Sequence, residues 1–168
     1  MLRKFRTSSL FLAMIGAAAM AGAAGVHGNA AVGQAGQAAQ VTRTVEVEMT
    51  DNMRYTPASI NVKQGETVLL RVKNAGLVRH ELVIGTPQDL VKHYDMMKKM
   101  PGMEHADANM VSVAAGQSGE IVWRFTQAGM VDFACLQPGH YDAGMQGLVN
   151  VAAAQPGKSG AASKTLFR

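Results

Sequence analysis

Four side chains in this 168-residue sequence could together hold a transition metal. Three of them, Cys135, His140 and Met145, lie on one short segment, with four residues between each ligand and the next. The fourth, His80, follows an Asn-Ala-Gly turn and directly precedes an apolar run. A thiolate and two imidazoles form a trigonal plane around copper, and a weak thioether completes the site from the axis. The combination therefore predicts an electron-transfer copper site.

Each of these residues alone has a more ordinary explanation. A single buried cysteine is usually a small core residue, and methionine fills irregular gaps in cores. Cys135 is the only cysteine in the chain, so a dimerising thiol or a nucleophile is also open. Zinc would accept the same side chains, although structural zinc sites prefer several thiolates. The joint occurrence of the four residues at this spacing favours copper.

The residues around the candidate ligands suit a copper-binding loop. Phe133 lies two residues before Cys135 on the same face of a strand, so we expect it to shield the metal from water. Pro138 has a fixed φ and stiffens the loop. Gly139 and Gly144 allow the backbone to turn beside two of the ligands.

A second group of soft ligands lies in one stretch of the chain. The sequence has twelve methionines, and five of them fall between residues 96 and 110, while two histidines lie between residues 93 and 105. Thioethers and imidazoles are suitable ligands for Cu(I), so the stretch is a candidate for a second, labile copper site. Its members are His93, Met96, Met97, Met100, Met103, His105 and Met110. The alternative is that these methionines pack a helix onto the rest of the fold.

Most of the segment 41–151 alternates between apolar and polar residues with a period of two, as half-buried strands do. Strands are expected at residues 44–49, 59–62, 67–73, 81–84, 111–113, 121–125, 131–135 and 148–151. Glycine, asparagine and proline separate these runs. Many short strands with such punctuation predict an all-β fold, an antiparallel β-sandwich or barrel.

One short helix is expected to interrupt the strands, near residues 87–100. Thr86 can cap it, Pro87 suits its first position, and Asp89 favours its first turn. The residues at helical spacing, expected to pack on the sandwich, are Leu90, Val91, Tyr94 and Met97.

The two ends of the chain differ from its centre. Basic residues near the start precede an apolar stretch and several small residues, so residues 1–30 are predicted to be a signal peptide that directs export to the periplasm. An uncleaved N-terminal anchor is the alternative. Residues 31–40 are expected to be a flexible leader and residues 152–168 a flexible tail. A single domain at residues 41–151 remains, with no stable membrane anchor.

The charge of the chain does not favour nucleic acid as a partner. Of its sixteen Lys and Arg residues, three lie in the predicted signal peptide and three in the tail, which leaves ten against twelve acidic residues in the domain. A nearly neutral domain offers no electrostatic attraction for a polyanion.

The segment 41–151 resembles the cupredoxins, or blue copper proteins, in its His…Cys-x4-His-x4-Met pattern. The resemblance implies a Greek-key β-sandwich with one type 1 copper at one end. It implies that His80, Cys135 and His140 are the equatorial ligands and that Met145 is the axial one. Residues 74–82, 100–105 and 135–147 are similar to those of periplasmic bacterial cupredoxins associated with copper tolerance.

Three classes of function are then open. The first is a periplasmic protein of copper tolerance, which binds copper or transfers electrons with a redox or copper-handling partner. The second is an electron carrier between respiratory or photosynthetic complexes, which has no need of a methionine-rich helix. The third, a copper enzyme, would need further copper centres with paired His-x-His motifs, and the sequence has none. We therefore expect a copper protein that is not an enzyme.

Overall fold

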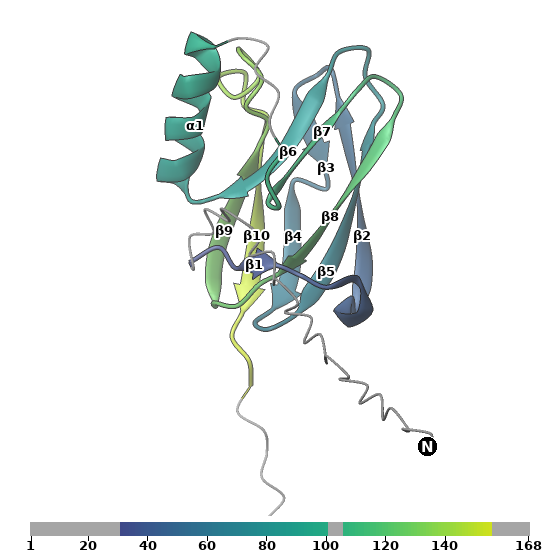
Figure 1. Ribbon diagram of the computed structural model, residues 1–168, viewed down its shortest axis with the longest axis vertical. Helices are drawn as coiled ribbons and strands as arrows, with labels where there is room; N and C mark the ends of the chain where they lie inside the picture. Colours follow the sequence, from purple (N-terminus) through teal and green to yellow (C-terminus); the bar gives the residue numbers. More distant parts are fainter. Residues whose placement is uncertain (1–30, 101–105, 156–168) are drawn as a thin grey trace, which may run out of the picture.

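The structure, a computed structural model, describes residues 31–100 and 106–155 and is a two-layer β-sandwich with a helix on one side (Figure 1). Its elements are β1 (Gln34–Ala35), the 3-10 helix η1 (Ala38–Gln40), β2 (Arg43–Thr50), β3 (Arg54–Thr56), β4 (Ser59–Lys63), β5 (Thr67–Asn74), β6 (His80–Gly85), α1 (Pro87–Lys99), β7 (Met110–Val113), β8 (Ser118–Arg124), β9 (Gly129–Ala134) and β10 (Gln146–Ala152). No helix in this part of the chain is long and apolar enough to cross a bilayer.

The strands form two sheets of five. One sheet has the order β1-β8-β5-β2-β3 and the other has the order β4-β10-β9-β6-β7. The predicted all-β Greek-key sandwich is therefore confirmed. Most neighbouring strands are antiparallel, as the sequence predicted, but β2 pairs with β5 and β4 pairs with β10 in parallel. The chain crosses to the second sheet as β4 before it returns as β5, so β5 runs in the same direction as β2.

The period of two in the sequence produces the core between the sheets. Alternate residues of β2, β5 and β8 are fully or almost fully buried, and they meet the inward side chains of the second sheet in one cluster. The first sheet contributes Val47, Met49, Val68, Leu70, Val72, Ile121 and Trp123. Burial of this much apolar surface is the main force that holds the two sheets together.

Residues 31–40, expected to be a flexible leader, instead lie against the first sheet. Val32 is buried, its carbonyl accepts a hydrogen bond from Trp123 Nε1 at 2.7 Å, and β1 pairs with β8. Gly33 permits this close approach, since a Cβ there would lie 2.2 Å from the carbonyl oxygen of Arg124. Val32 is the only large apolar residue of this segment, so the sequence shows no period there.

The predicted helix is confirmed as α1, which connects β6 to β7 and covers the second sheet near β6 and β9 (Figure 1). The Thr86 hydroxyl accepts a hydrogen bond from the backbone N–H of Asp89 at 3.2 Å, as expected for a helix cap. Leu90, Tyr94 and Met97 are buried against the sheet. Val91 was expected beside them, but it lies on the exposed side of the helix.

Candidate metal centre

The four candidate ligands lie at one end of the sandwich, although they come from different elements. His80 begins β6, and Cys135 directly follows β9. His140 lies in the loop between β9 and β10, and Met145 ends that loop directly before β10. Because β6 and β9 are hydrogen-bonded neighbours, the sheet brings His80 close to Cys135 across 54 intervening residues of chain.

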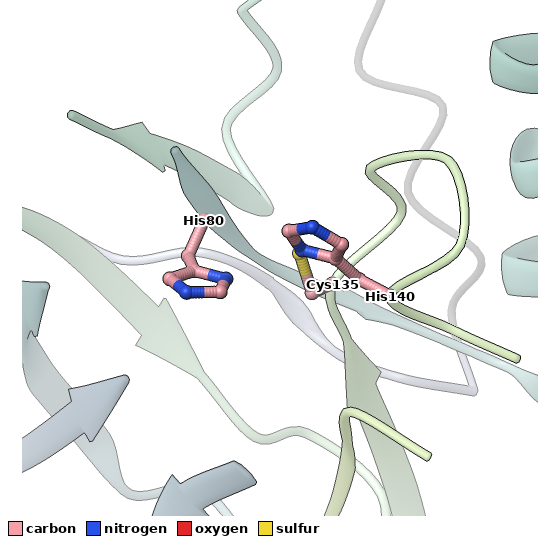
Figure 2. Close-up of side chains that lie close together, drawn as sticks. All are labelled: His80, Cys135 and His140. Carbon is pink, nitrogen blue, oxygen red and sulfur yellow. The ribbon is translucent and has the colours of Figure 1, made fainter. Parts of the chain in front are cut away.

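Three of the four side chains form a compact group. One donor atom from each of His80, Cys135 and His140 lies within 4.8 Å of the others. Cys135 Sγ is 3.3 Å from His140 Nδ1, and the two imidazole rings have centroids 4.9 Å apart. Figure 2 shows the thiol and the two rings gathered in one space. No other group of three His, Cys, Asp or Glu donors is this close within residues 31–100 and 106–155.

The imidazole of His80 is oriented by a carboxylate. His80 is fully buried, and its Nε2 lies 3.0 Å from Asp51 Oδ1. Because an ionised carboxylate only accepts hydrogen bonds, Nε2 carries the proton and the lone pair is left on Nδ1. Nδ1 is buried and has no hydrogen-bond partner in the described part of the protein. A buried lone pair of this kind suits a metal ion.

The thiol of Cys135 is fully buried and is directed by the backbone. The N–H of Glu81 donates to Sγ at 3.3 Å, and the backbone of Gln137 also interacts with it. Burial raises the pKa of the thiol to about 12, although both backbone groups act in the opposite direction. A bound cation would replace the thiol proton and supply the charge that the apolar surroundings lack.

His140 is the only one of the four candidate ligands that is not fully buried. Burial lowers the pKa of its imidazole. A lower pKa favours the neutral ring, which is the form that binds metals. The ring is also directed by its own backbone, since the N–H of His140 donates to the carbonyl of Gln137 at 3.0 Å.

Met145 is fully buried in the same core cluster as Cys135. Its carbonyl accepts a hydrogen bond from the N–H of Cys135 at 3.1 Å, and its own N–H donates to the carbonyl of His140 at 3.0 Å. These two bonds join the backbones of three candidate ligands. The structure thus places the backbone of Met145 next to that of Cys135.

The conformation of the loop that carries His140 depends on two glycines within it and on the side chain of Arg54. Gly139 and Gly144 both have φ of 87°, so the expected turns beside the ligands are confirmed. From outside, the Arg54 guanidinium donates to the carbonyl of Ala143 at 2.9 Å and lies against Gly144. No pattern in the sequence indicated this role of Arg54, because Arg54 and Ala143 are 89 positions apart.

Phe133 was expected to cover the metal, and it is fully buried in the core cluster that contains Cys135 and Met145. Its ring packs edge-on against Tyr55 with centroids 4.9 Å apart. The hydroxyl of Tyr55 in turn donates to the carbonyl of Glu81 at 2.5 Å. The aromatic pair therefore supports the strand that presents His80 and adds buried apolar surface to the core cluster that contains Cys135 and Met145.

The candidate ligands of the second copper site differ in burial. Met97 and Met110 are buried in the cluster under α1, which is the packing role considered as the alternative. Met96 and Met100 are exposed by 38% and 46%, and His93 is partly buried. Met103 and His105 lie outside the described residues.

The residues present fit a copper ion. Two nitrogen donors, one thiol and an adjacent thioether match a metal that alternates between a soft and a harder state. The orphaned Nδ1 of His80 gives independent support, because a buried acceptor without a partner is costly unless a cation occupies the space beside it. Backbone N–H groups at Sγ would stabilise a thiolate.

Comparison with known proteins agrees with the geometry. Residues 41–152 match the model of the family described as copper-binding proteins of the plastocyanin/azurin family. The chain is 54% identical to the copper-resistant cuproprotein CopI of Rubrivivax gelatinosus over 71% of this chain and 72% of that protein. It is 35% identical to the protein of the same name from Pseudomonas aeruginosa, over 71% of this chain and 81% of the relative.

Solved structures show the same fold. A reduced auracyanin from Roseiflexus castenholzii superimposes with a TM-score of 0.57 at 25% identity, and the match covers 67% of this chain and 98% of the auracyanin. Auracyanin B gives a TM-score of 0.59 at 22% identity and covers 72% and 96% of the two chains. With its family match, its relatives and its sandwich, the chain belongs to the plastocyanin/azurin family of copper-binding proteins, the cupredoxins.

Proposed function

We propose that this chain is a periplasmic type 1 copper protein that takes part in copper tolerance. In this proposal His80, Cys135 and His140 are the three strong ligands and Met145 is the weak axial ligand. The single observation that carries it is the group of three buried or half-buried donors within 4.8 Å of one another at one end of the sandwich. The link to tolerance rests on relatives that are named copper-resistant cuproproteins.

The protein's part in this function is to hold a site of nearly fixed shape. Copper would supply a one-electron couple between Cu(I) and Cu(II). The backbone bonds among Cys135, His140 and Met145 keep three ligands in register, and Tyr55 and Phe133 surround Cys135 and Met145 with apolar surface in the same buried cluster. The half-buried His140 is where an electron or the ion would enter, since the other three ligands are fully buried.

Spectroscopy of the copper-loaded protein tests the site. A type 1 centre gives intense thiolate-to-copper absorption in the visible range and a narrow EPR hyperfine splitting. Loading that gives neither signal, with copper bound instead in a tetragonal nitrogen and oxygen environment, would refute the proposed ligand set. Mass spectrometry of protein from the periplasmic fraction tests export, because removal of residues within 1–30 is expected there.

We propose that the protein carries copper or electrons and is not a catalyst. The second candidate function is electron transfer between respiratory or photosynthetic complexes. Copper tolerance and electron transfer could use the same metal centre. A deletion strain separates them. Tolerance predicts poor growth in raised copper with normal respiration, whereas a respiratory carrier predicts the reverse. Complementation with the His80→Ala variant should fail in either case.

The proposal also includes a second, labile copper site near the C-terminal end of α1. Met96 on α1 and Met100, which caps the C-terminal end of that helix, are four residues apart and both exposed, so their thioethers can reach one Cu(I) ion together with His93, which lies one turn before Met96. Cu(I) titration should give more than one ion per chain, and the Met96→Ala/Met100→Ala variant should lose the excess. Met130→Ala is the control, because Met130 is 73% exposed and lies on β9. A stoichiometry fixed at one ion would refute the second site.

A further inference from the structure

Helix α1 contacts the copper loop through the hydroxyl of one tyrosine. The backbone N–H of Gly139 donates to Tyr94 Oη at 2.9 Å, and the hydroxyl donates to Asp142 Oδ2 at 2.7 Å. The phenol therefore uses both its acceptor and its donor capacity on the same loop. The two residues that it joins lie on either side of His140.

The ring of Tyr94 is held firmly from the helix side. It is only 3% exposed and packs with Leu90 and Met97 in the cluster under α1. The Lys98 ammonium lies 4.6 Å from the ring centroid, and Asp95 binds that ammonium at 2.9 Å. A side chain fixed in this way can impose its position on a loop, rather than follow the loop.

Residues 139–142 of the copper loop have little burial of their own to hold their conformation. Gly139 and Asp142 are exposed, and Gly139 has a left-handed φ that leaves the backbone free to choose other conformations. The ring of Tyr141 packs against Tyr94 with centroids 5.1 Å apart, so the contact continues past His140. Arg54 restrains the loop at a further point, the carbonyl of Ala143.

We propose that Tyr94 is a positioning residue for the copper site. Its hydroxyl fixes residues 139–142 so that Nδ1 of His140 faces Cys135 Sγ before copper arrives. This role gives the inserted helix a function in the metal centre that is independent of its methionines. The inference rests on the proposed role of His140 as a ligand, and its consequence is slower loss of copper from the site.

The Tyr94→Phe variant tests this role, because it removes the hydroxyl and keeps the ring packing. In the metal-free protein, hydrogen exchange of the Gly139 amide should accelerate and NMR order parameters of residues 139–142 should fall. In the loaded protein, copper transfer to a Cu(I) chelator should accelerate about 10-fold, the lower end of losses seen when a group that supports a metal ligand is removed. Asp142→Asn keeps an acceptor for the hydroxyl and should behave almost as the unmodified protein does.

Loss of stability alone must be separated from loss of positioning. Asn109→Ala removes a side-chain hydrogen bond to the carbonyl of Ile84, at 2.7 Å, near the same helix but away from the loop. If Tyr94→Phe releases copper no faster than Asn109→Ala does, and Gly139 exchange is unchanged, the proposal is overturned. If His140→Ala keeps the full copper spectrum, the ligand assignment fails instead. The metal-free exchange measurement still decides whether Tyr94 restrains the loop.

Discussion

Asp51 Oδ1 lies 3.0 Å from His80 Nε2, although the two residues are separated by 29 positions in the sequence. The same carboxylate accepts hydrogen bonds from the backbone N–H groups of Leu77 at 2.8 Å and Val78 at 3.4 Å. The bond from Leu77, and secondly that from His80, lowers the pKa of Asp51, so the group is ionised at neutral pH. Asp51 thus holds the segment that leads into β6 and sets the orientation of a candidate ligand.

The Asp51→Asn variant should raise the reduction potential of the bound copper. The substitution keeps an oxygen that can accept the hydrogen bond from His80, but it removes a negative charge near the metal. Cu(II) loses more from that removal than Cu(I) does, because the higher charge interacts more strongly with the carboxylate. A redox titration followed by visible absorption measures the change.

Two further variants make this prediction specific. Asp51→Ala removes the hydrogen bond as well, so copper affinity should also fall by about 10–100-fold. Glu120→Gln removes one exposed carboxylate, which pairs with Arg71 on the other sheet, and should leave the potential unchanged. A potential that Asp51→Asn leaves unaltered or lowers would contradict the proposed orientation of His80.

The Met145→Leu variant should keep its copper and show a higher reduction potential. Met145 is fully buried beside Cys135, and leucine has a similar volume, so the core should tolerate the exchange. Loss of a weak axial donor removes more stabilisation from Cu(II) than from Cu(I). An unchanged or lower potential, with copper still bound, would show that the thioether is not an axial ligand.

The Cys135→Ala variant should lose all intense visible absorption when it is loaded with copper. Sγ lies within 4.8 Å of a ring nitrogen of each imidazole, and thiolate-to-copper charge transfer needs this sulfur. His93→Ala should keep the colour, because His93 lies on α1 outside the main site. A coloured Cys135→Ala protein would refute the assignment.

The copper loop could be predicted from the sequence because its information is local. Cys135, His140 and Met145 occur within eleven residues, and the period of two identified the strand before them. The glycines beside the candidate ligands predicted backbone turns, and the φ of 87° at Gly139 and Gly144 confirms them. His80 was found through its place at the start of an apolar strand.

The residues that orient these ligands could not be predicted. Asp51, Arg54 and Tyr94 reach the site over 29, 89 and 45 positions of sequence, and none of them belongs to a periodic pattern that points there. Their roles arise only when the sandwich places a turn, an edge strand and a helix around one loop. The contribution of β1 was missed for the same reason, since it depends on contact with Trp123.

The Gly147→Ala variant should destabilise the domain and disturb the metal centre together. Gly147 lies opposite Phe133 in the pairing of β10 with β9. A Cβ at this position would lie 2.2 Å from Phe133 Cζ and 2.9 Å from the carbonyl oxygen of Ala58. Phe133 cannot move freely, because it is fully buried against Tyr55. Overpacking of this kind costs about 1–3 kcal/mol of the free energy of unfolding.

Chemical denaturation of the metal-free protein measures that cost, and a double-mutant cycle identifies its source. Phe133→Leu alone leaves a cavity, but combined with Gly147→Ala it makes room for the new methyl group. The two substitutions should therefore be less destabilising together than the sum of their separate effects, with a coupling of about 0.5–3 kcal/mol. Because Phe133 lies two residues before Cys135, the single Gly147→Ala variant should also broaden the EPR signal of bound copper. Strict additivity would show that the contact with Ala58, rather than the ring, makes glycine necessary here.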